Sequence, residues 1–168
     1  YLIDAGLREA GKRTGLLGTI ETRVAGEVLP SARTTPEATD LHALLAVMRE
    51  RGVQAVAMEV SSHALTLGRV DGVVFDVAAF TNLSQDHLDF HRDMADYFAA
   101  KALLFTAAHS RRGVLTVDDE WGRRMAAGAK VPVITTGESA DVDWRRHDEL
   151  PATASRPGSV ELAGPGRR

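Results

Sequence analysis

The segment from Gln54 to Val60, QAVAMEV, most constrains what this chain can fold into. It is almost continuously apolar, and such a run is typical of a parallel strand that is buried on both faces. A strand of this kind requires helices on both sides of its sheet. The neighbouring sequence supplies them, because strand-like and helix-like segments alternate with short links. We therefore predict an α/β fold with a mainly parallel sheet flanked by helices.

The expected elements follow from hydrophobic periodicity and from glycine and proline signals. Helices are predicted over residues 1–10, 37–51, 94–105 and 120–129. Strands are predicted over residues 14–20, 54–60, 74–80, 113–117 and 131–135, with weaker strand patterns near 142–144 and 159–162. A β-hairpin over residues 22–29 is expected to turn at Ala25-Gly26.

Composition excludes several classes of protein. The length of 168 residues allows a real hydrophobic core, and the net charge of −3 gives no electrostatic footprint for nucleic acid. No apolar run approaches the roughly 18 residues that span a bilayer, and no signal peptide is visible. The absence of cysteine excludes disulfides and thiolate metal sites. We expect a cytoplasmic monomer that binds neither nucleic acid nor membrane.

A dense polar segment follows the predicted strand that ends at Phe80. Ligands of α/β proteins bind at the carboxyl ends of strands, so chemistry is expected here. His87 and His91 are four residues apart, which would place both on one helix face, as in many metal pairs. Asp86 and Asp89 would add the hard oxygen ligands that magnesium prefers. One histidine on a metal and one in a structural hydrogen bond is an equally good interpretation.

Lys101 lies on the apolar stripe of the predicted helix 94–105, four residues after Tyr97 and four before Phe105. Its methylene stem could pack on the core while the ammonium reaches water. Alternatively, the side chain could point into a site where burial lowers its pKa and the neutral amine reacts. The spacing is compatible with both interpretations.

Glu59 ends the apolar run 54–60, where burial of its charge requires a partner. We interpret it as a metal ligand or water holder, with an ion pair to a core arginine as the alternative. Ser62 and His63 suggest a nucleophile and a base, but adjacent residues on a strand point to opposite faces, which argues against a serine hydrolase. Thr34 and Thr35 precede Pro36 at a helix start, and on these residues alone simple N-capping is favoured.

Five motifs occur in one order along the chain: LLGTI, TTPEA, MEVSSHAL with GRV, FTNLSQDHLDFH and YFAAKALLF. This series resembles the central domain of the Mur ligases, a domain of P-loop type. Within that family it is similar to the members that add the third amino acid to UDP-N-acetylmuramoyl-L-alanyl-D-glutamate. The resemblance covers Tyr1 to about Thr136, and we expect residues 1–168 to be part of one such domain.

The resemblance implies an ATP-dependent ligase of peptidoglycan synthesis that uses Mg²⁺. The terminal carboxylate of the UDP-N-acetylmuramoyl-dipeptide would form an acyl phosphate, and an incoming amine would displace phosphate. That amine would come from meso-diaminopimelate or L-lysine. The composition is rich in Arg and Ala, which is typical of a GC-rich bacterium, and in such an organism diaminopimelate is the expected amino acid.

The resemblance also implies roles for individual residues. Thr34, Thr35, Ser61 and Arg69 would hold the muramoyl-peptide substrate. Glu59 and His87 would bind magnesium, and Lys101 would be carbamylated by carbon dioxide, giving an anion that positions a magnesium ion. Lys101 and His87 would thus serve catalysis, Asn82, Asp86 and Asp89 would support them, and His63 and His91 would make structural hydrogen bonds.

Parts of the family pattern fall outside this sequence. A Walker A loop is expected immediately before Tyr1, and a uridine-nucleotide domain and a C-terminal domain are expected elsewhere in a longer protein. The chain alone is therefore expected to be inactive, or to be a silent binding domain. The remaining alternatives are a sibling ligase, such as the one that joins D-Ala-D-Ala, and a metal-dependent phosphohydrolase using the DHLDFH cluster.

Overall fold

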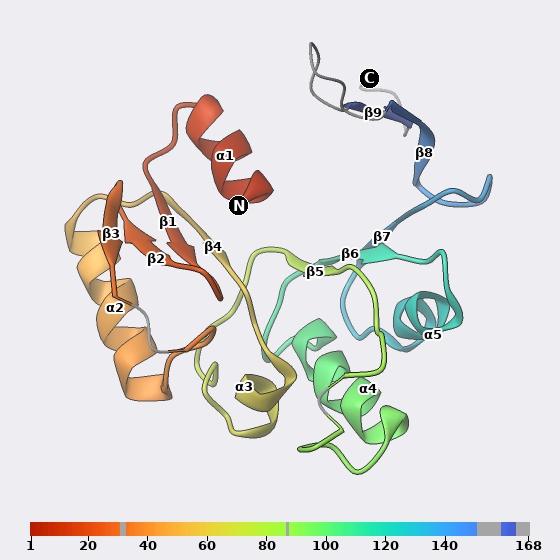
Figure 1. Ribbon diagram of the computed structural model, residues 1–168, viewed down its shortest axis with the longest axis horizontal. Coiled ribbons are helices and arrows are strands. Elements are labelled where there is room, and N and C mark those ends of the chain that lie inside the picture. The colour runs from red at the N-terminus through yellow and green to blue at the C-terminus, as the bar shows by residue number, and fades with distance from the viewer. Residues whose placement is uncertain (31–32, 87, 151–158, 164–168) are drawn as a thin grey trace. The chain divides into compact units, whose positions relative to one another are not determined.

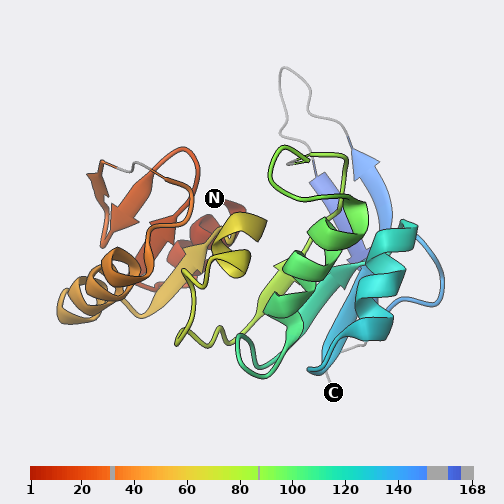
Figure 2. The same ribbon diagram turned by 90° about the horizontal axis from the view of Figure 1, so that it is seen from below.

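The computed structural model describes residues 1–30, 33–86, 88–150 and 159–163, and for residues 146–150 and 159–163 it describes the backbone alone. The chain forms two compact units, Tyr1–Gly72 and Val73–Arg168 (Figures 1 and 2). They are called the first and the second unit below, and each is described by itself.

The first unit combines a mixed sheet with three helices. Its elements are α1 (Leu2–Glu9), β1 (Thr14–Leu17), β2 (Thr22–Val24), β3 (Glu27–Leu29), α2 (Ala38–Glu50), β4 (Ala55–Met58) and α3 (Ser62–Thr66). The strand order is β3-β2-β1-β4. β4 runs parallel to β1, and β2 is antiparallel to both β1 and β3. The predicted hairpin is confirmed, with positive φ angles at Ala25 (52°) and Gly26 (95°), as a tight type I′ turn requires.

Helices α1 and α2 cover opposite faces of β1 in the first unit (Figure 1). Thr14 faces α1, where its hydroxyl donates to Asp4 Oδ1 at 2.5 Å. Gly15 faces α2, and a Cβ at this position would come within 2.7 Å of the sulfur of Met48. Because neighbouring strand residues point to opposite faces, one strand anchors both helices. The absence of a side chain at Gly15 lets α2 approach closely.

Helix α1 fully buries a carboxylate, whereas two of the three apolar residues that indicated it are exposed and the third, Leu7, is half-buried. Leu2 is 90% exposed and Ile3 is 63% exposed, whereas Asp4 is completely buried. Asp4 Oδ2 lies 3.0 Å from Arg23 Nη1 and 3.1 Å from Arg8 Nε. A buried charge is tolerated where ion pairs and hydrogen bonds satisfy it, and these contacts do so.

Strand β4 confirms the parallel pairing predicted for residues 54–60, but the expected burial on both faces is incomplete. The strand is shorter than predicted and is the outer strand of the first unit's sheet. Val56 is consequently 38% exposed.

The second unit contains a five-stranded sheet with two helices. Its elements are β5 (Ala78–Phe80), α4 (Met94–Ala102), the 3₁₀ turn η1 (Leu103–Phe105), β6 (Gly113–Thr116), α5 (Glu120–Gly128), β7 (Val133–Gly137), β8 (Trp144–Leu150) and β9 (Ser159–Ala163). The strand order is β5-β6-β7-β8-β9, and pairing is parallel except between β8 and β9. The α/β class with mainly parallel pairing is thus confirmed in this unit.

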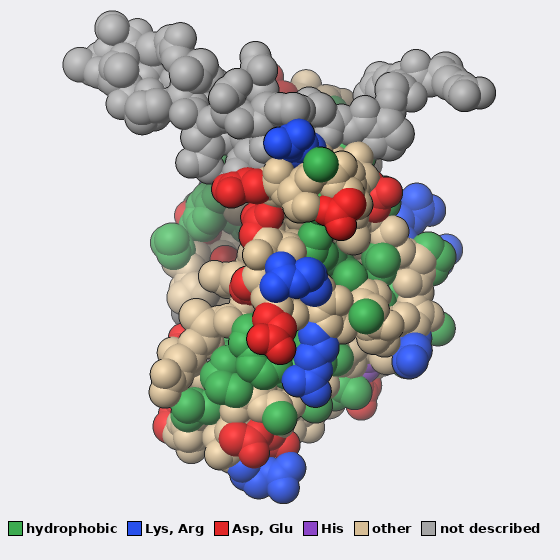
Figure 3. Space-filling view, turned by 90° about the vertical axis from the view of Figure 1, so that its right-hand side faces the viewer, with side chains coloured by type: hydrophobic (Ala, Val, Ile, Leu, Met, Phe, Trp, Pro, Cys, Tyr) green, Lys and Arg blue, Asp and Glu red, His purple; other side chains and the backbone are tan. Residues whose placement is uncertain are grey.

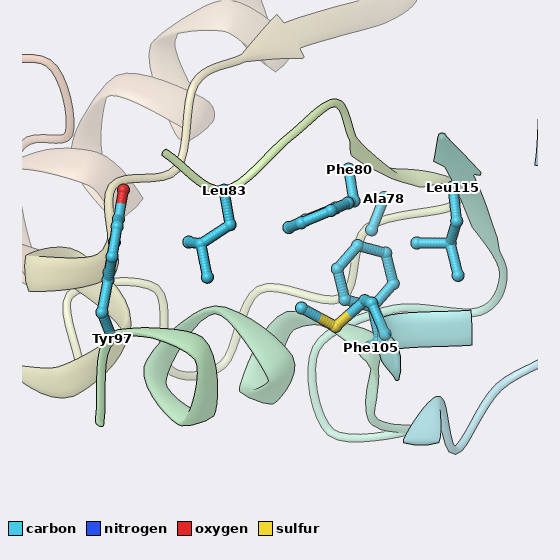
Figure 4. Packing of buried hydrophobic residues seen from close by; sticks show 7 residues of the cluster. Ala78, Phe80, Leu83, Tyr97, Phe105 and Leu115 are labelled. Atoms are coloured by element: carbon cyan, nitrogen blue, oxygen red, sulfur yellow. The ribbon is translucent and has the colours of Figure 1, made fainter. Parts of the chain in front are cut away.

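The core of the second unit lies between its sheet and helices α4 and α5 (Figures 2 and 4). The buried cluster consists of Ala78, Phe80, Leu83, Tyr97, Phe105, Leu115 and Met125. Phe80 meets Phe105 edge to face, with ring centroids 6.4 Å apart, which is a favourable aromatic geometry. This packing fixes α4, the helix that carries Lys101, against the end of β5.

Candidate functional site

Glu59 follows β4 directly and is held by a threonine from the neighbouring strand's extension. Its Oε2 accepts hydrogen bonds from the backbone N–H of Thr19 at 3.1 Å and from Thr19 Oγ1 at 2.7 Å. The Glu59 N–H donates to the carbonyl of Leu17 at 2.9 Å, which continues the parallel pairing of β1 with β4. The partner of the Glu59 carboxylate is therefore a threonine. Among the described residues, no arginine forms the ion pair that the alternative interpretation expected.

Thr34 and Thr35 do not cap α2, so the N-capping interpretation is wrong. The N-cap of α2 is Glu37, which makes no side-chain capping bond. Instead Thr34 Oγ1 lies 3.1 Å from Thr19 Oγ1. The buried Thr35 hydroxyl donates to the carbonyl of Glu59 at 3.0 Å and accepts from the N–H of Ser61 at 3.2 Å. Thr35 thus joins the loop before α2 to the end of β4, and Thr34 joins the same loop to the segment that follows β1.

Ser61 begins α3, a helix that the sequence interpretation placed in an extended strand. Its Oγ accepts from the Ala64 N–H at 3.1 Å, which caps the helix. The reason given for setting Ser62 and His63 aside, opposite faces of a strand, is therefore wrong. Ser62 is buried at the start of the helix and His63 is half-buried in it. Ser61 retains a hydroxyl hydrogen that it can donate elsewhere.

These contacts connect residues from three separate stretches of sequence into one cluster. We call it the Glu59 network, and its members are Thr19, Thr34, Thr35, Glu59 and Ser61. The atoms that make its hydrogen bonds are carboxylate, hydroxyl and carbonyl oxygens and backbone N–H groups. Such a site is suited to hard cations and to hydrogen-bonded polar ligands.

Arg69 has its guanidinium fork on Glu37. Nε donates to Glu37 Oε2 at 3.1 Å, and Nη2 lies 2.9 Å from Oε1, while the Arg69 side chain is only 12% exposed. Arg33 Nη1 also lies 2.9 Å from Glu37 Oε1. Two arginines therefore share one carboxylate. Another carboxylate or a phosphate could bind this Nε–Nη2 edge of Arg69 by displacing Glu37.

Lys101 is half-buried on α4, in the second unit. Its Nζ lies 5.1 Å from the centre of the Tyr97 ring. Burial lowers the pKa of Lys101 from its ordinary value, and the carboxylate of Asp86 acts in the opposite direction. Half burial of the side chain is compatible with both interpretations of Lys101, and the direction of its pKa is the one that the second interpretation expects. Asp86, Tyr97 and Lys101 are called the Lys101 group below.

The polar segment before α4 is not helical, so the expected helix face shared by two histidines is wrong. Residues 88–93 form turns and bends, and His87 lies outside the described residues. His91 is buried, its ring stacks on Tyr97 with centroids 5.0 Å apart, and its Nδ1 lies 3.7 Å from Asp96 Oδ2. These contacts agree with a structural role for His91. Asn82, Asp86 and Asp89 are exposed.

Among the described residues, no three His, Cys, Asp or Glu side chains gather closely enough to hold a metal ion by themselves. Within the same ranges, none of the helices has the length and apolar character that crossing a bilayer requires. On the face of the molecule in Figure 3, acidic and basic side chains are interspersed, so neither sign of charge dominates that face.

Two residues of these sites were missed from the sequence, Thr19 and Glu37. Thr19 stands in the LLGTI motif, two residues after β1, and parallel strands bring their carboxyl ends to one edge. That rule could have paired Thr19 with Glu59. Glu37 was treated only as the beginning of a helix. Nothing in the local sequence indicates that it reaches Arg69.

Comparison with known proteins adds an independent result. The family model described as the Mur ligase middle domain matches residues 1–161. A protein of Streptomyces coelicolor named UDP-N-acetylmuramoyl-L-alanyl-D-glutamate--2,6-diaminopimelate ligase is 63% identical over 147 residues, which are 86% of this chain and 29% of that protein. A UDP-N-acetylmuramyl-tripeptide synthetase of Leifsonia xyli is 51% identical over 170 residues, covering all of this chain and 33% of that protein.

A solved structure is also similar. It is described as UDP-N-acetylmuramoyl-L-alanyl-D-glutamate--2,6-diaminopimelate ligase, and it matches 97% of this chain and 34% of its own with a TM-score of 0.82 and 26% identity. The chain thus spans about a third of the length of the relatives it matches.

Proposed function

This chain belongs to the Mur ligase family, and from this premise we propose that it is the middle domain of an ATP-dependent ligase. The ligase would join meso-diaminopimelate to UDP-N-acetylmuramoyl-L-alanyl-D-glutamate. The substrate carboxylate attacks the γ-phosphorus of ATP, ADP leaves and an acyl phosphate forms. The amine then attacks the acyl carbon, phosphate leaves and one proton is released. Other parts of a longer protein would supply the Walker A loop, the uridine-nucleotide domain and the C-terminal domain.

The Glu59 network is the observation that carries this proposal. It places a carboxylate at the ends of two parallel strands, where α/β proteins bind ligands. The surrounding groups offer oxygen atoms, which suit Mg²⁺. We propose that Glu59 contributes a ligand to magnesium. Magnesium would neutralise the negative charge that gathers on the transferring phosphoryl group. His87 remains a proposed second ligand.

Substrate binding is proposed for residues of the same unit. Thr34 and Ser61 have hydroxyl groups at the edge of the network. Arg69 would pair with an anionic group of the muramoyl-peptide once that group replaces Glu37 on its fork. The Thr35 hydroxyl already donates to Glu59 and accepts from Ser61. Its proposed contribution is therefore to shape the loop that presents Thr34.

Lys101 is proposed to be carbamylated. The neutral amine attacks the carbon of carbon dioxide, loses a proton and becomes a carbamate anion, which would position a magnesium ion. The lowered pKa of Lys101 supports this chemistry, because it increases the fraction of neutral amine at a given pH. Asp86 and Asn82 would support the lysine and the neighbouring segment.

The choice of diaminopimelate is supported by the name of the Streptomyces coelicolor relative, which is 63% identical. Use of ATP and of a nucleotide-linked substrate favours the cytoplasm as the place of reaction. We also propose that the ligase acts as a monomer, which light scattering after size-exclusion chromatography would check.

The full-length protein should be assayed with UDP-N-acetylmuramoyl-L-alanyl-D-glutamate, ATP and Mg²⁺, following phosphate release. Diaminopimelate and L-lysine are offered in separate reactions. Release that depends on diaminopimelate is the expected result. Release that depends only on lysine would correct the substrate, and no release with either amino acid would overturn the ligase assignment.

A further inference from the structure

Thr19 was given no role of its own in the function proposed above. It is nevertheless exposed and contacts both Glu59 and Thr34. Its N–H and its hydroxyl both reach the same carboxylate oxygen, Glu59 Oε2, at 3.1 and 2.7 Å. Two donors on one oxygen fix the position of that oxygen better than one donor does. Among the described residues, no hydrogen-bond donor lies on the other oxygen, Oε1.

Gly18 leaves room for this arrangement. A Cβ at Gly18 would come within 3.0 Å of Glu59 Oε1, which is tighter than ordinary contact. The chain therefore approaches the carboxylate with a glycine on one side and two donors on the other. Oε2 is held, and Oε1 keeps its lone pairs for a further partner.

The hydroxyl contacts also define the direction of the hydrogen bond between the two threonines. Thr19 Oγ1 has one hydrogen, and an ionised carboxylate can only accept, so that hydrogen goes to Glu59. The contact of 3.1 Å between Thr19 Oγ1 and Thr34 Oγ1 must then be donated by Thr34. Thr34 consequently presents lone pairs to a ligand and recognises an N–H or O–H group. It does not recognise a carboxylate or a phosphate oxygen.

We propose that Thr19 is a positioning residue that orients Glu59 toward magnesium and makes Thr34 an acceptor for a donor group of the substrate. This rests on the proposed ligase function, in which Glu59 binds the metal and Thr34 the muramoyl-peptide. Thr19 itself touches neither of them in this scheme. It acts through the two side chains that it holds.

The test uses the full-length protein with Thr19→Val, which keeps the shape and removes the hydroxyl, and Thr19→Ser, which restores the hydroxyl. Thr39→Val, at an exposed position of α2, is the matched control. Binding of Mn²⁺, as a stand-in for Mg²⁺, is measured by calorimetry and by electron paramagnetic resonance. The KM for UDP-N-acetylmuramoyl-L-alanyl-D-glutamate and the melting temperature are measured beside it.

Thr19→Val is expected to weaken Mn²⁺ binding about 10-fold, the usual effect of removing a group that orients a metal ligand. It should raise the KM for the muramoyl-dipeptide, whereas Thr19→Ser and Thr39→Val should resemble the wild type. Unchanged Mn²⁺ affinity and KM in folded Thr19→Val would overturn the proposal. So would a loss that Thr19→Ser fails to restore.

A double-mutant comparison keeps the proposal open to refutation if Thr19→Val folds poorly. In that case Thr19→Ala replaces it, alone and combined with Glu59→Gln. If Thr19 acts through Glu59, the double variant should bind Mn²⁺ no worse than Glu59→Gln alone. Additive losses would contradict the proposal. Metal binding that depends on Thr19 without any ligase turnover in the wild type would instead refute the proposed function. It would support the orientation of Glu59 by Thr19 and overturn the substrate role of Thr34.

Discussion

The two candidate sites are built in different ways, although each follows a strand of a parallel pair. In the first unit, the Glu59 network consists of hydrogen bonds between residues as far apart in sequence as Thr19 and Glu59. In the second unit, the Lys101 group depends on burial, with the ammonium over the Tyr97 ring and its pKa lowered by loss of solvent. The first site is defined by the directions of its hydrogen bonds, and the second by the partial burial of a cationic side chain.

Because the two sites are built differently, we expect substitutions in them to reduce activity for different reasons. A hydrogen-bonded carboxylate loses function when its orientation or charge changes, even if its volume is kept. A lysine that must be carbamylated loses function when its amine is removed. An added carboxylate such as acetate can then take the place of the missing carbamate anion. Substitutions in the Glu59 network and in the Lys101 group can therefore be compared by their loss of activity and by their response to added carboxylate.

The largest effect is expected for Lys101→Ala in the full-length protein, assayed for the proposed ligase activity. Loss of the proposed carbamate should reduce kcat by about 1,000-fold, the upper range for removing one group that stabilises transition-state charge. Acetate or formate should restore part of the activity, because either supplies a carboxylate. Lys130→Ala, at an exposed position, is the control. Wild-type activity in Lys101→Ala would remove the distinction between the two sites.

Glu59→Gln should reduce activity by about 100-fold and raise the Mg²⁺ concentration for half-maximal rate, because an amide keeps the shape but loses the charge. Acetate should not rescue this variant, since the glutamine still fills the position. Glu50→Gln on the exposed side of α2 provides the comparison. Rescue by acetate would mean that both sites respond to the same chemistry.

Arg69→Ala should raise the KM for the muramoyl-dipeptide by about 10-fold, which corresponds to the loss of one charge-assisted interaction. The KM for ATP should stay near that of the wild type. Arg51→Ala serves as the control, because Arg51 is an exposed arginine paired with Glu27. A change confined to ATP would contradict the substrate role of Arg69.

The smallest effect concerns pH and the Lys101 group. The Asp86 carboxylate raises the pKa of Lys101, so Asp86→Asn should lower that pKa further below its ordinary value. Acylation of Lys101 by a succinimidyl ester, followed by mass spectrometry, should then begin at a lower pH. Asp76→Asn should leave the profile unchanged. An unchanged profile in Asp86→Asn would show that the Asp86 charge does not act on Lys101, and a shift toward higher pH would contradict the sign of the expected effect.

The lowered pKa of Lys101 also makes the free energy of unfolding depend on pH. Burial of the charged amine opposes folding below the folded-state pKa of Lys101, and this cost disappears as pH rises toward the unfolded value of 10.5. The Lys101 contribution therefore becomes more favourable with rising pH in that range. Denaturant titrations of wild type and Lys101→Met should converge there, and parallel curves would contradict this.

The fold was largely predictable, because its signals are local. The turn at Ala25-Gly26 and the beginning of α4 near Met94 depend on neighbouring residues and on apolar spacing. The burial of Asp4 was not predictable in this way, since it depends on Arg23 and Thr14 from other elements. Local propensity describes a segment, whereas tertiary partners decide which of its side chains are covered.

The sites divide similarly. Glu59 was identified because a carboxylate at the end of an apolar run needs a partner. The partner itself, Thr19, was missed, because finding it requires β1 and β4 to be recognised as a parallel pair whose carboxyl ends meet. Thr34 and Thr35 carried a strong local signal for capping, and contacts with Thr19, Glu59 and Ser61 overrode it.

The contact of Met48 with Gly15 has a consequence for oxidation chemistry. Met48 is 1% exposed, and its sulfur lies 2.7 Å from the point where a Cβ at Gly15 would stand. Peroxide would add an oxygen atom to that sulfur, and a close-packed interior does not readily accept the extra atom. Oxidation of Met48 should therefore require the helix to lift from the strand. The rate of Met48 oxidation, measured by mass spectrometry of the peptide that contains it, would then report the rate of local opening in the first unit.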